Sequence, residues 1–349
     1  MAKIRGLLGL TKRNILVYMN SKGSIFFSML TPLIILILYL LFLKSTFLSS
    51  LEHAATGLEK LILAKDMDQF VNGILLTGII STALITIPYN ALETIVRDRE
   101  DRVYFDMIST PVKRAEIILS YFLAAVVSAF FQTLVVLFCG IGVLLLNGTM
   151  YFEISDIIGL VGVIFLGTLS STAIFTLIMM FFKKMGTCSA FMGIISAVSG
   201  FIVGAYLPLS EFSKTIQNVC NLIPATGITV LIRNFLTGGV LNHMDESIGG
   251  VDGGAFLHAM REHFSFNTQV GSSTWSLNQT CIYMNHPHRL HVGKGFCYAA
   301  ERHEPARCSM HPAEQGMSTM PLSHWLTFGN TFLKIFAAPF MSAFVIVPS

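Results

Sequence analysis

Long apolar runs alternate with short charged segments along most of this chain. Five runs contain no Asp, Glu, Lys or Arg, and they cover residues 23–43, 69–92, 117–146, 157–182 and 185–210. A helix rises 1.5 Å per residue, so about 20 apolar residues cross a hydrocarbon core of about 30 Å. Backbone amides in hydrocarbon need internal hydrogen bonds, which favours helices. The predicted fold class is an all-α integral membrane protein with five clear spans.

The composition agrees with a chain that lives in a bilayer. Hydrophobic residues make up 53% of it and charged residues only 12%, whereas soluble domains carry about 25% charged residues. The net charge of +3 is too small and too dispersed to indicate nucleic-acid binding. No catalytic triad, carboxylate pair or metal signature stands out, and no G-x-x-x-x-G-K-[ST] phosphate-binding loop occurs. We therefore expect no enzymatic activity and no cofactor or metal bound by this chain.

Basic residues gather in alternate loops. The leader before the first run contains Lys3, Arg5, Lys12, Arg13 and Lys22 and no acidic residue. Residues 45–68 instead carry two lysines and four acids, and residues 147–156 carry two acids and no base. Because Lys and Arg favour the cytoplasmic side, the N-terminus is predicted to be cytoplasmic. We expect a multi-pass protein of a plasma membrane, most simply a bacterial one.

The leader itself is amphipathic. Apolar and weakly polar side chains recur at helical spacing at Ile4, Leu7, Leu8, Thr11, Ile15, Tyr18 and Met19. A basic helix with such a stripe is typical of the membrane interface, where it contacts lipid. It is either an orientation anchor only or a helix that also packs on the bundle.

The loop over residues 93–116 is the most informative segment. Eleven of its 24 residues are charged, yet it contains the apolar residues Val103, Tyr104, Phe105, Met107 and Ile108. This pattern favours a short helix that docks on a cytosolic partner and ends before Pro111, which disfavours helical geometry at the preceding residue. The alternative is a solvated loop with a turn along the membrane surface.

The end of this loop resembles the first cytoplasmic loop of ABC-2 type exporter permeases. The matching residues are Ser109-Thr110-Pro111-Val112-Lys113-Arg114, followed by Glu116-Ile117-Ile118. Arg102 departs from the family, which often has glycine there. The amphipathic leader, the order of spans and residues 207–233, similar to the short re-entrant helices of that family, extend the resemblance over residues 1–240.

The resemblance implies the membrane subunit of an ATP-binding cassette exporter. Such permeases act as dimers, with a second copy or a homologous permease, and a separate ATPase subunit binds ATP and Mg. It also implies that the loop is a coupling helix to this ATPase, with Arg97, Arg99, Val103, Phe105, Met107, Ile108, Pro111 and Arg114 as its contact residues. Two alternatives are an ion-coupled carrier, disfavoured because the five spans lack ionisable residues, and a non-transporting scaffold or immunity protein.

Two further sets of residues are candidates for function. Small residues recur four apart in the fifth run at Ser196, Gly200 and Gly204. They predict either a dimer contact or close packing within one bundle. A line of hydroxyl residues in the fourth run, at Thr168, Ser171, Thr172 and Thr176, predicts either a substrate path or hydroxyls bonded to their own helix.

The chain changes character near its C-terminal end. Residues 241–284 are expected to form an extracytoplasmic loop and, from about Ser276, the start of a doubtful sixth span. Residues 281–324 then hold six of the ten histidines, three of the six cysteines and four of the eleven prolines. His286, His288, Cys297 and Cys308 match no standard zinc spacing. The composition of residues 285–349 instead predicts translation in a wrong reading frame and a poor or inactive transporter.

Overall fold

The computed structural model describes residues 2–45, 47–49, 64–110, 112–147, 154–248, 255–266, 268–270 and 273–275. All of them belong to one compact unit, Met1–Leu277. Pro111, the expected start of a sixth span at Ser276, the tail over residues 285–349 and the Cys/His set within that tail lie outside the described residues.

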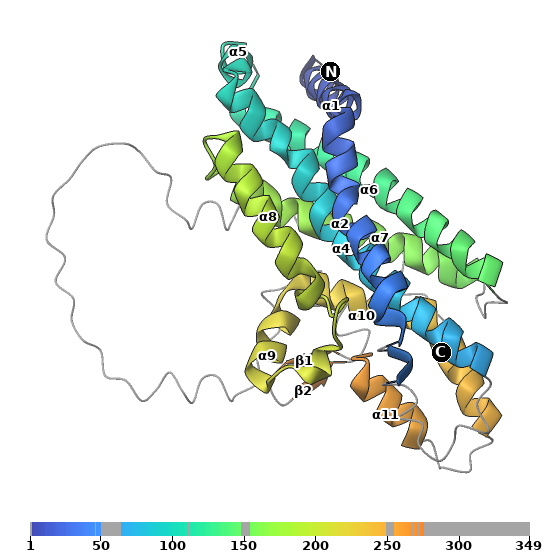
Figure 1. Ribbon diagram of the computed structural model, residues 1–349. Helices are drawn as coiled ribbons and strands as arrows, with labels where there is room; N and C mark the ends of the chain where they lie inside the picture. Colours follow the sequence, from blue (N-terminus) through green and yellow to red (C-terminus); the bar gives the residue numbers. More distant parts are fainter. Residues whose placement is uncertain are drawn as a thin grey trace, which may run out of the picture. The chain divides into compact units, whose positions relative to one another are not determined.

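The first part of the chain forms a series of long helices (Figure 1). They are α1 (Ala2–Asn20), α2 (Lys22–Leu38) with a π-helical continuation (Tyr39–Leu43), α4 (Ala64–Glu100), α5 (Val103–Ile108), α6 (Arg114–Asn147), α7 (Ile154–Met179) and α8 (Met185–Ile202). Shorter elements follow. They are a 3-10 turn (Leu209–Glu211), α9 (Lys214–Leu222), α10 (Pro224–Ile248), α11 (Ala255–His263) and an antiparallel pair of strands, β1 (Thr268–Val270) and β2 (Ser273–Trp275).

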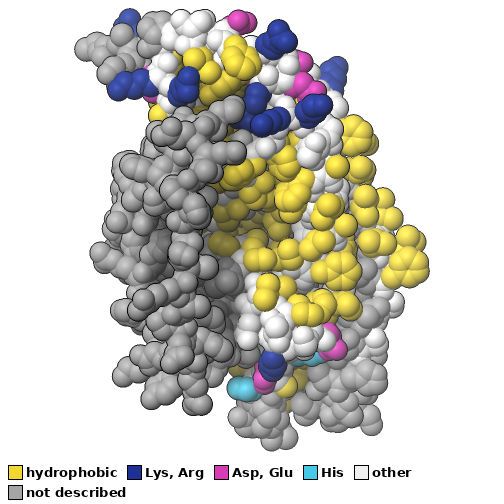
Figure 2. Space-filling view, turned by 90° about the vertical axis from the view of Figure 1, so that its left-hand side faces the viewer, with side chains coloured by type: hydrophobic (Ala, Val, Ile, Leu, Met, Phe, Trp, Pro, Cys, Tyr) yellow, Lys and Arg dark blue, Asp and Glu magenta, His cyan; other side chains and the backbone are white. Residues whose placement is uncertain are grey.

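Within the described residues, four helices are long and apolar enough to cross a membrane: α4, α6, α7 and α8. Two bent pairs raise the number to six if each pair is one span: α1 with α2, bent by 71°, and α9 with α10, bent by 88°. Figure 2 shows the corresponding surface, where a broad apolar band separates a strongly basic end from the opposite end. The all-α membrane fold is confirmed, and the first predicted span corresponds to α2 and its continuation.

Helix α4 is the central element of the bundle. Its apolar window is 100% buried, whereas that of α8 is only 22% buried. It packs against α2, α6, α7, α8 and α10. Three of its buried hydroxyl side chains, Thr77, Thr82 and Thr86, donate to carbonyl groups of their own helix.

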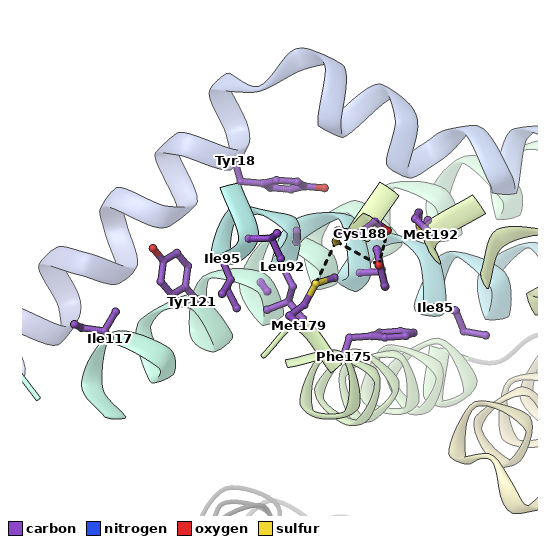
Figure 3. Packing of buried hydrophobic residues seen from close by; sticks show 14 of the residues in the cluster. Tyr18, Ile85, Leu92, Ile95, Ile117, Tyr121, Phe175, Met179, Cys188 and Met192 are labelled. Atoms are coloured by element: carbon purple, nitrogen blue, oxygen red, sulfur yellow. Dashed lines mark hydrogen bonds between the residues drawn. The ribbon is translucent and has the colours of Figure 1, made fainter. Parts of the chain in front are cut away.

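Two apolar clusters lie near opposite ends of the bundle. The first, here called the α11 end, is centred on the rings of Phe70, Phe264 and Phe266. The second includes partly buried residues of α1 and α5, and its end of the bundle is here called the α5 end. Figure 3 shows its buried side chains. Its side chains come from several helices and include Tyr18, Ile85, Leu92, Ile95, Ile117, Tyr121, Phe175, Met179, Cys188 and Met192.

Helix α8 ends earlier than the apolar run predicts, at Ile202 instead of residue 210. Gly204 has a left-handed backbone with φ of 70°. The N–H of Ala205 donates to the carbonyl of Gly200 at 2.8 Å, and that of Gly204 to the carbonyl of Phe201 at 3.2 Å. These two bonds form a Schellman motif, which stops a helix whatever the hydrophobicity of the residues that follow.

Two other features differ from expectation. The extracytoplasmic loop expected from residue 241 begins later, because α10 continues to Ile248. The stripe predicted for the leader is divided between two sides of α1. Thr11 and Tyr18 are buried, whereas Leu8 and Met19 are exposed. Helix α1 therefore packs on the bundle, mainly against α6, and only part of its stripe faces outward.

Candidate functional site

The short helix α5 follows an unusual backbone turn. Its N-cap residue, Arg102, has a left-handed conformation with φ of 64°, and its carbonyl accepts a hydrogen bond from the N–H of Phe105 at 2.9 Å. This conformation costs a residue with a side chain about 1–2 kcal/mol. It gives a physical reason for the glycine that the resemblance led us to expect there, and shows that arginine is accommodated at the same turn.

Helix α5 has an inner and an outer side. Tyr104, Met107 and Ile108 are half-buried and pack against the apolar cluster of the α5 end. Phe105 points away from that cluster and is 61% exposed. Figure 1 shows α5 at the extreme tip of the bundle, beyond the end of α4. The arrangement presents an exposed aromatic ring on a helix that is fixed to the body of the protein.

The other residues predicted for this contact lie in different settings. Arg114 is exposed, and Val103 and Arg97 are half-buried. Arg99 is directed into the protein, where its guanidinium donates to the carbonyl of Phe182 at 2.6 Å and to that of Met180 at 3.3 Å. Arg99 therefore contacts the segment after α7, whereas Arg114 is available at the surface.

A polar network beside α5 joins α1, α4 and α6. Asp98 of α4 is buried, and its carboxylate accepts hydrogen bonds from the guanidinium of Arg13 and the hydroxyl of Tyr121. The hydrogen bond with Asp98 raises the pKa of Arg13 above its ordinary value, so this side chain keeps its charge. One residue further along α1, the Asn14 amide donates to the hydroxyl of Ser120 at 3.0 Å.

Sequence reasoning missed Asp98 as a member of this site. It stands in a run of charged residues, and nothing in that run distinguishes a buried carboxylate from a solvated one. One signal was available: Asp98 lies five residues after Glu93 and two before Glu100 on a helix that has no charged residue in the 24 positions before Glu93. A helix continuing beyond residue 92 would have placed part of the charged run against neighbouring helices.

Exposed basic side chains are grouped in three segments of the chain. They are Arg5, Lys12, Lys22, Arg102, Lys113, Arg114, Lys183 and Lys184. They come from the leader, the loop around α5 and the segment between α7 and α8. Figure 2 shows Lys and Arg side chains gathered at this end, above the apolar band.

The hydroxyl residues of α7 are buried inside the bundle. Thr168, Thr172 and Thr176 each donate to a carbonyl of their own helix, at 2.8, 2.6 and 2.7 Å. Ser171 is also buried. The back-bonded alternative thus describes the three threonines in this structure, and the substrate path stays a prediction.

The small residues of the fifth run do not share one helical face. Ser196 and Gly200 belong to α8, but Gly204 lies beyond its end. Gly200 is buried beneath the ring of Tyr206, which a larger side chain would overlap. Gly200 therefore makes an internal contact, and a dimer contact through this set stays a prediction.

These features define a multi-pass helical membrane protein with a short external helix fixed at its basic end. The described residues contain no group of three His, Cys, Asp or Glu that could hold a metal ion. A family model described as ABC-2 family transporter protein matches residues 49–284, and the chain belongs to this family. It is a membrane permease of ABC-type transport. Neither a curated protein nor a solved structure shows significant similarity to it.

Proposed function

We propose that this chain is the membrane-spanning subunit of an exporter driven by a separate ABC ATPase. The observation that carries the proposal is α5, whose inner side is packed into the bundle and whose outer side presents Phe105. An exposed aromatic ring among charged residues is typical of the centre of a protein contact. The family membership supports an ABC ATPase as the partner.

The packing of α5 would allow movement of a bound ATPase to reach the ends of the membrane-spanning helices. Tyr104, Met107 and Ile108 contact the same cluster as residues of α4, α6, α7 and α8. A partner that pushes on Phe105 would therefore displace helix ends and not only a loop. In this proposal the ATPase binds ATP and Mg, and its closure moves the spans of a chain that carries no phosphate-binding loop.

The charge distribution supports a cytoplasmic position for α1 and α5. The exposed basic side chains listed above lie at the α5 end, as expected for the cytoplasmic face of a plasma-membrane protein. The exposed apolar residues of α1, Leu8, Leu16 and Met19, with Arg5 and Lys12, suit the headgroup region of the inner leaflet. A second permease copy or a homologue completes the proposed transporter.

Co-purification with the ATPase tests the proposal. The chain is expressed together with candidate ABC ATPases of the same organism and purified in mild detergent. Phe105→Asp places a charge at the centre of the contact and should abolish co-purification, while the level of inserted protein stays unchanged. Ile216→Asp, the same kind of change at an exposed apolar residue of α9 near the opposite end, is the matched control.

The ATPase should remain bound to Ile216→Asp and to the conservative variant Phe105→Leu. Binding of the ATPase to Phe105→Asp with wild-type affinity would show that α5 is not the contact. Transport is not needed as a readout, which matters because the composition of residues 285–349 predicts a poor transporter.

A further inference from the structure

The last turn of α4 ends in three consecutive charged residues, Asp98, Arg99 and Glu100, and each makes a different connection. Successive residues of a helix point about 100° apart, so three in a row face most directions around the axis. Helix α5 begins at Val103, three residues after Glu100. The three side chains are therefore placed to connect α5 with several spans at once.

Asp98 connects α4 to α1 and α6 through Arg13 and Tyr121. The hydroxyl of Tyr121 also lies 3.7 Å from the sulfur atom of Met107 in α5. Asp98 is buried, so these connections are formed inside the protein and not across solvent. The carboxylate of Asp98 thus joins the end of α4 to α1 and α6, and Tyr121 joins α6 to α5.

Arg99 connects α4 to the end of α7. Its guanidinium donates to the carbonyls of Met180 and Phe182, which follow the last residue of α7, and it lies 5.8 Å from the centre of the Tyr104 ring of α5. The last carbonyls of a helix lack intrahelical donors and carry partial negative charge. A cation from α4 thus lies at the C-terminal end of another helix, where the helix dipole favours it, while it contacts α5.

Glu100 connects α4 to the beginning of α8. Its carboxylate accepts a hydrogen bond from the N–H of Met185, the first residue of α8, at 2.7 Å. The N-cap residue of α8, Lys184, makes no capping bond with its own side chain. Glu100 therefore supplies both the acceptor and the negative charge that a helix N-terminus favours.

The segment between α7 and α8 is consequently held at both ends by two adjacent residues of α4. Helix α8 is also the least buried of the four candidate spans, so it has the fewest contacts within the chain that resist displacement. We propose that Asp98, Arg99 and Glu100 form a relay that passes movement of α5 to the neighbouring helices, and to α8 in particular. This inference rests on the proposed function, because α5 moves only if an ATPase acts on it.

Arg99 and Glu100 are thereby assigned as positioning residues that act through α7 and α8, and not as contacts of the ATPase. The assignment separates binding from transmission. Changes at Phe105 should abolish binding of the ATPase. Changes at Arg99 and Glu100 should leave the ATPase bound, but α8 should no longer move when the ATPase binds ATP. If the contacts of Arg99 with the end of α7 and of Glu100 with the start of α8 serve stability only, α8 should still move in response to ATP when both residues are changed.

Distance measurements between spin labels test the relay in the complex of the full chain with its ATPase. Labels are attached at Phe138→Cys on α6 and Val198→Cys on α8, both exposed positions, in a background in which Cys139, Cys281, Cys297 and Cys308 are replaced by Ser. The distance is compared without nucleotide and with ATP and vanadate. In the chain with wild-type Arg99 and Glu100 we expect ATP and vanadate to change the distance between the two labels. In the double variant Arg99→Met/Glu100→Ala this change should be less than half as large.

Three controls accompany the measurement. Asp101→Ala removes the next charge, which is exposed, and should keep the full shift. Arg99→Lys retains a cation near the carbonyls and should restore at least half of the shift when Glu100 is present. ATPase affinity is measured for each variant and should stay within about twofold of wild type, because binding is not the step affected.

The outcomes separate the two proposals. An undiminished shift in the double variant overturns the relay and leaves the proposed function standing. Loss of ATPase binding in the double variant assigns the two residues to the docking surface, which also overturns the relay. Absence of any ATPase bound to the wild-type chain overturns the proposed function, and the relay with it.

Discussion

Removal of the charge at Arg13 and removal of the charge at Asp98 should have unequal effects on stability. The two side chains form one ion pair, but their surroundings differ: the side chain of Arg13 is 33% exposed and that of Asp98 only 6%. Arg13→Met would leave the Asp98 carboxylate buried without its cation. Asp98→Asn would leave an arginine that reaches water by extending its long side chain.

The exposure of the two side chains sets how much stability each of the two variants should lose. Removing one partner of a buried ion pair costs about 3–5 kcal/mol, and the partial exposure of Arg13 places Arg13→Met near the lower limit, at about 3 kcal/mol. In Asp98→Asn the amide oxygen still accepts the hydroxyl of Tyr121, so the cost is that of a weakened hydrogen bond, about 1 kcal/mol. Lys12→Met, the same change at an exposed neighbour, should stay within about 0.5 kcal/mol of wild type.

Unfolding in mixed micelles with increasing SDS, followed by circular dichroism, measures these differences. The double variant Arg13→Met/Asp98→Leu should be less destabilised than the sum of its single variants, because it leaves no buried charge. If Asp98→Asn is as unstable as Arg13→Met, or less stable, the reasoning is refuted. In that case the buried Asp98 carboxylate does not depend on the partly exposed Arg13 more than Arg13 depends on it.

Three further predictions concern topology, the glycines and the tail. Cysteine labelling of intact cells should succeed for Thr56→Cys and fail for Asp101→Cys, and the reverse pattern would invert the proposed orientation. Gly200→Leu should destabilise the protein by about 1–3 kcal/mol through overpacking, and Gly204→Ala by about 1 kcal/mol through its left-handed backbone; unchanged stability with less crosslinked dimer would favour a contact between copies instead. Resequencing around codon 285 should reveal a shifted frame, and an intact frame with robust ATP-dependent export would contradict that prediction.

The helical spans could be predicted because the membrane imposes a requirement on every residue. Runs of uncharged apolar residues located α6 and α7 to within three residues and the central part of α4, which continues to Glu100, since no other backbone conformation satisfies isolated amides in hydrocarbon. The end of α8 was misplaced because hydrophobicity continues through a backbone stop at Gly204. Glycine after an apolar helix is a known stop signal, and it would have corrected the boundary.

The site was predictable in part. The alternation of charged and apolar residues located α5, and the exposure of Phe105 agrees with its expected role as a surface contact. The direction of Arg99 could not be read from the sequence, because its acceptors, Met180 and Phe182, lie more than 80 residues away. The partners of Asp98 are equally distant along the chain or belong to another helix, so only the packed structure identifies them.

The match to the ABC-2 family ends at residue 284, directly before the segment whose composition changes. That residues 285–349 do not continue the family sequence stays a prediction. The sixth span could not be placed by periodicity, because the histidines and prolines after Met284 interrupt the apolar pattern from which a span would be predicted.

Photocrosslinking from position 105 tests the central claim most directly. p-Benzoylphenylalanine replaces Phe105 in one sample and Phe131 of α6 in another; the two rings are almost equally exposed, at 61% and 63%, but Phe131 belongs to an apolar span. After illumination of intact cells, mass spectrometry identifies the crosslinked partners. The account predicts an ABC ATPase crosslinked from position 105 and none from position 131. Crosslinks from position 105 to lipid alone, or to the same partners as position 131, would contradict it.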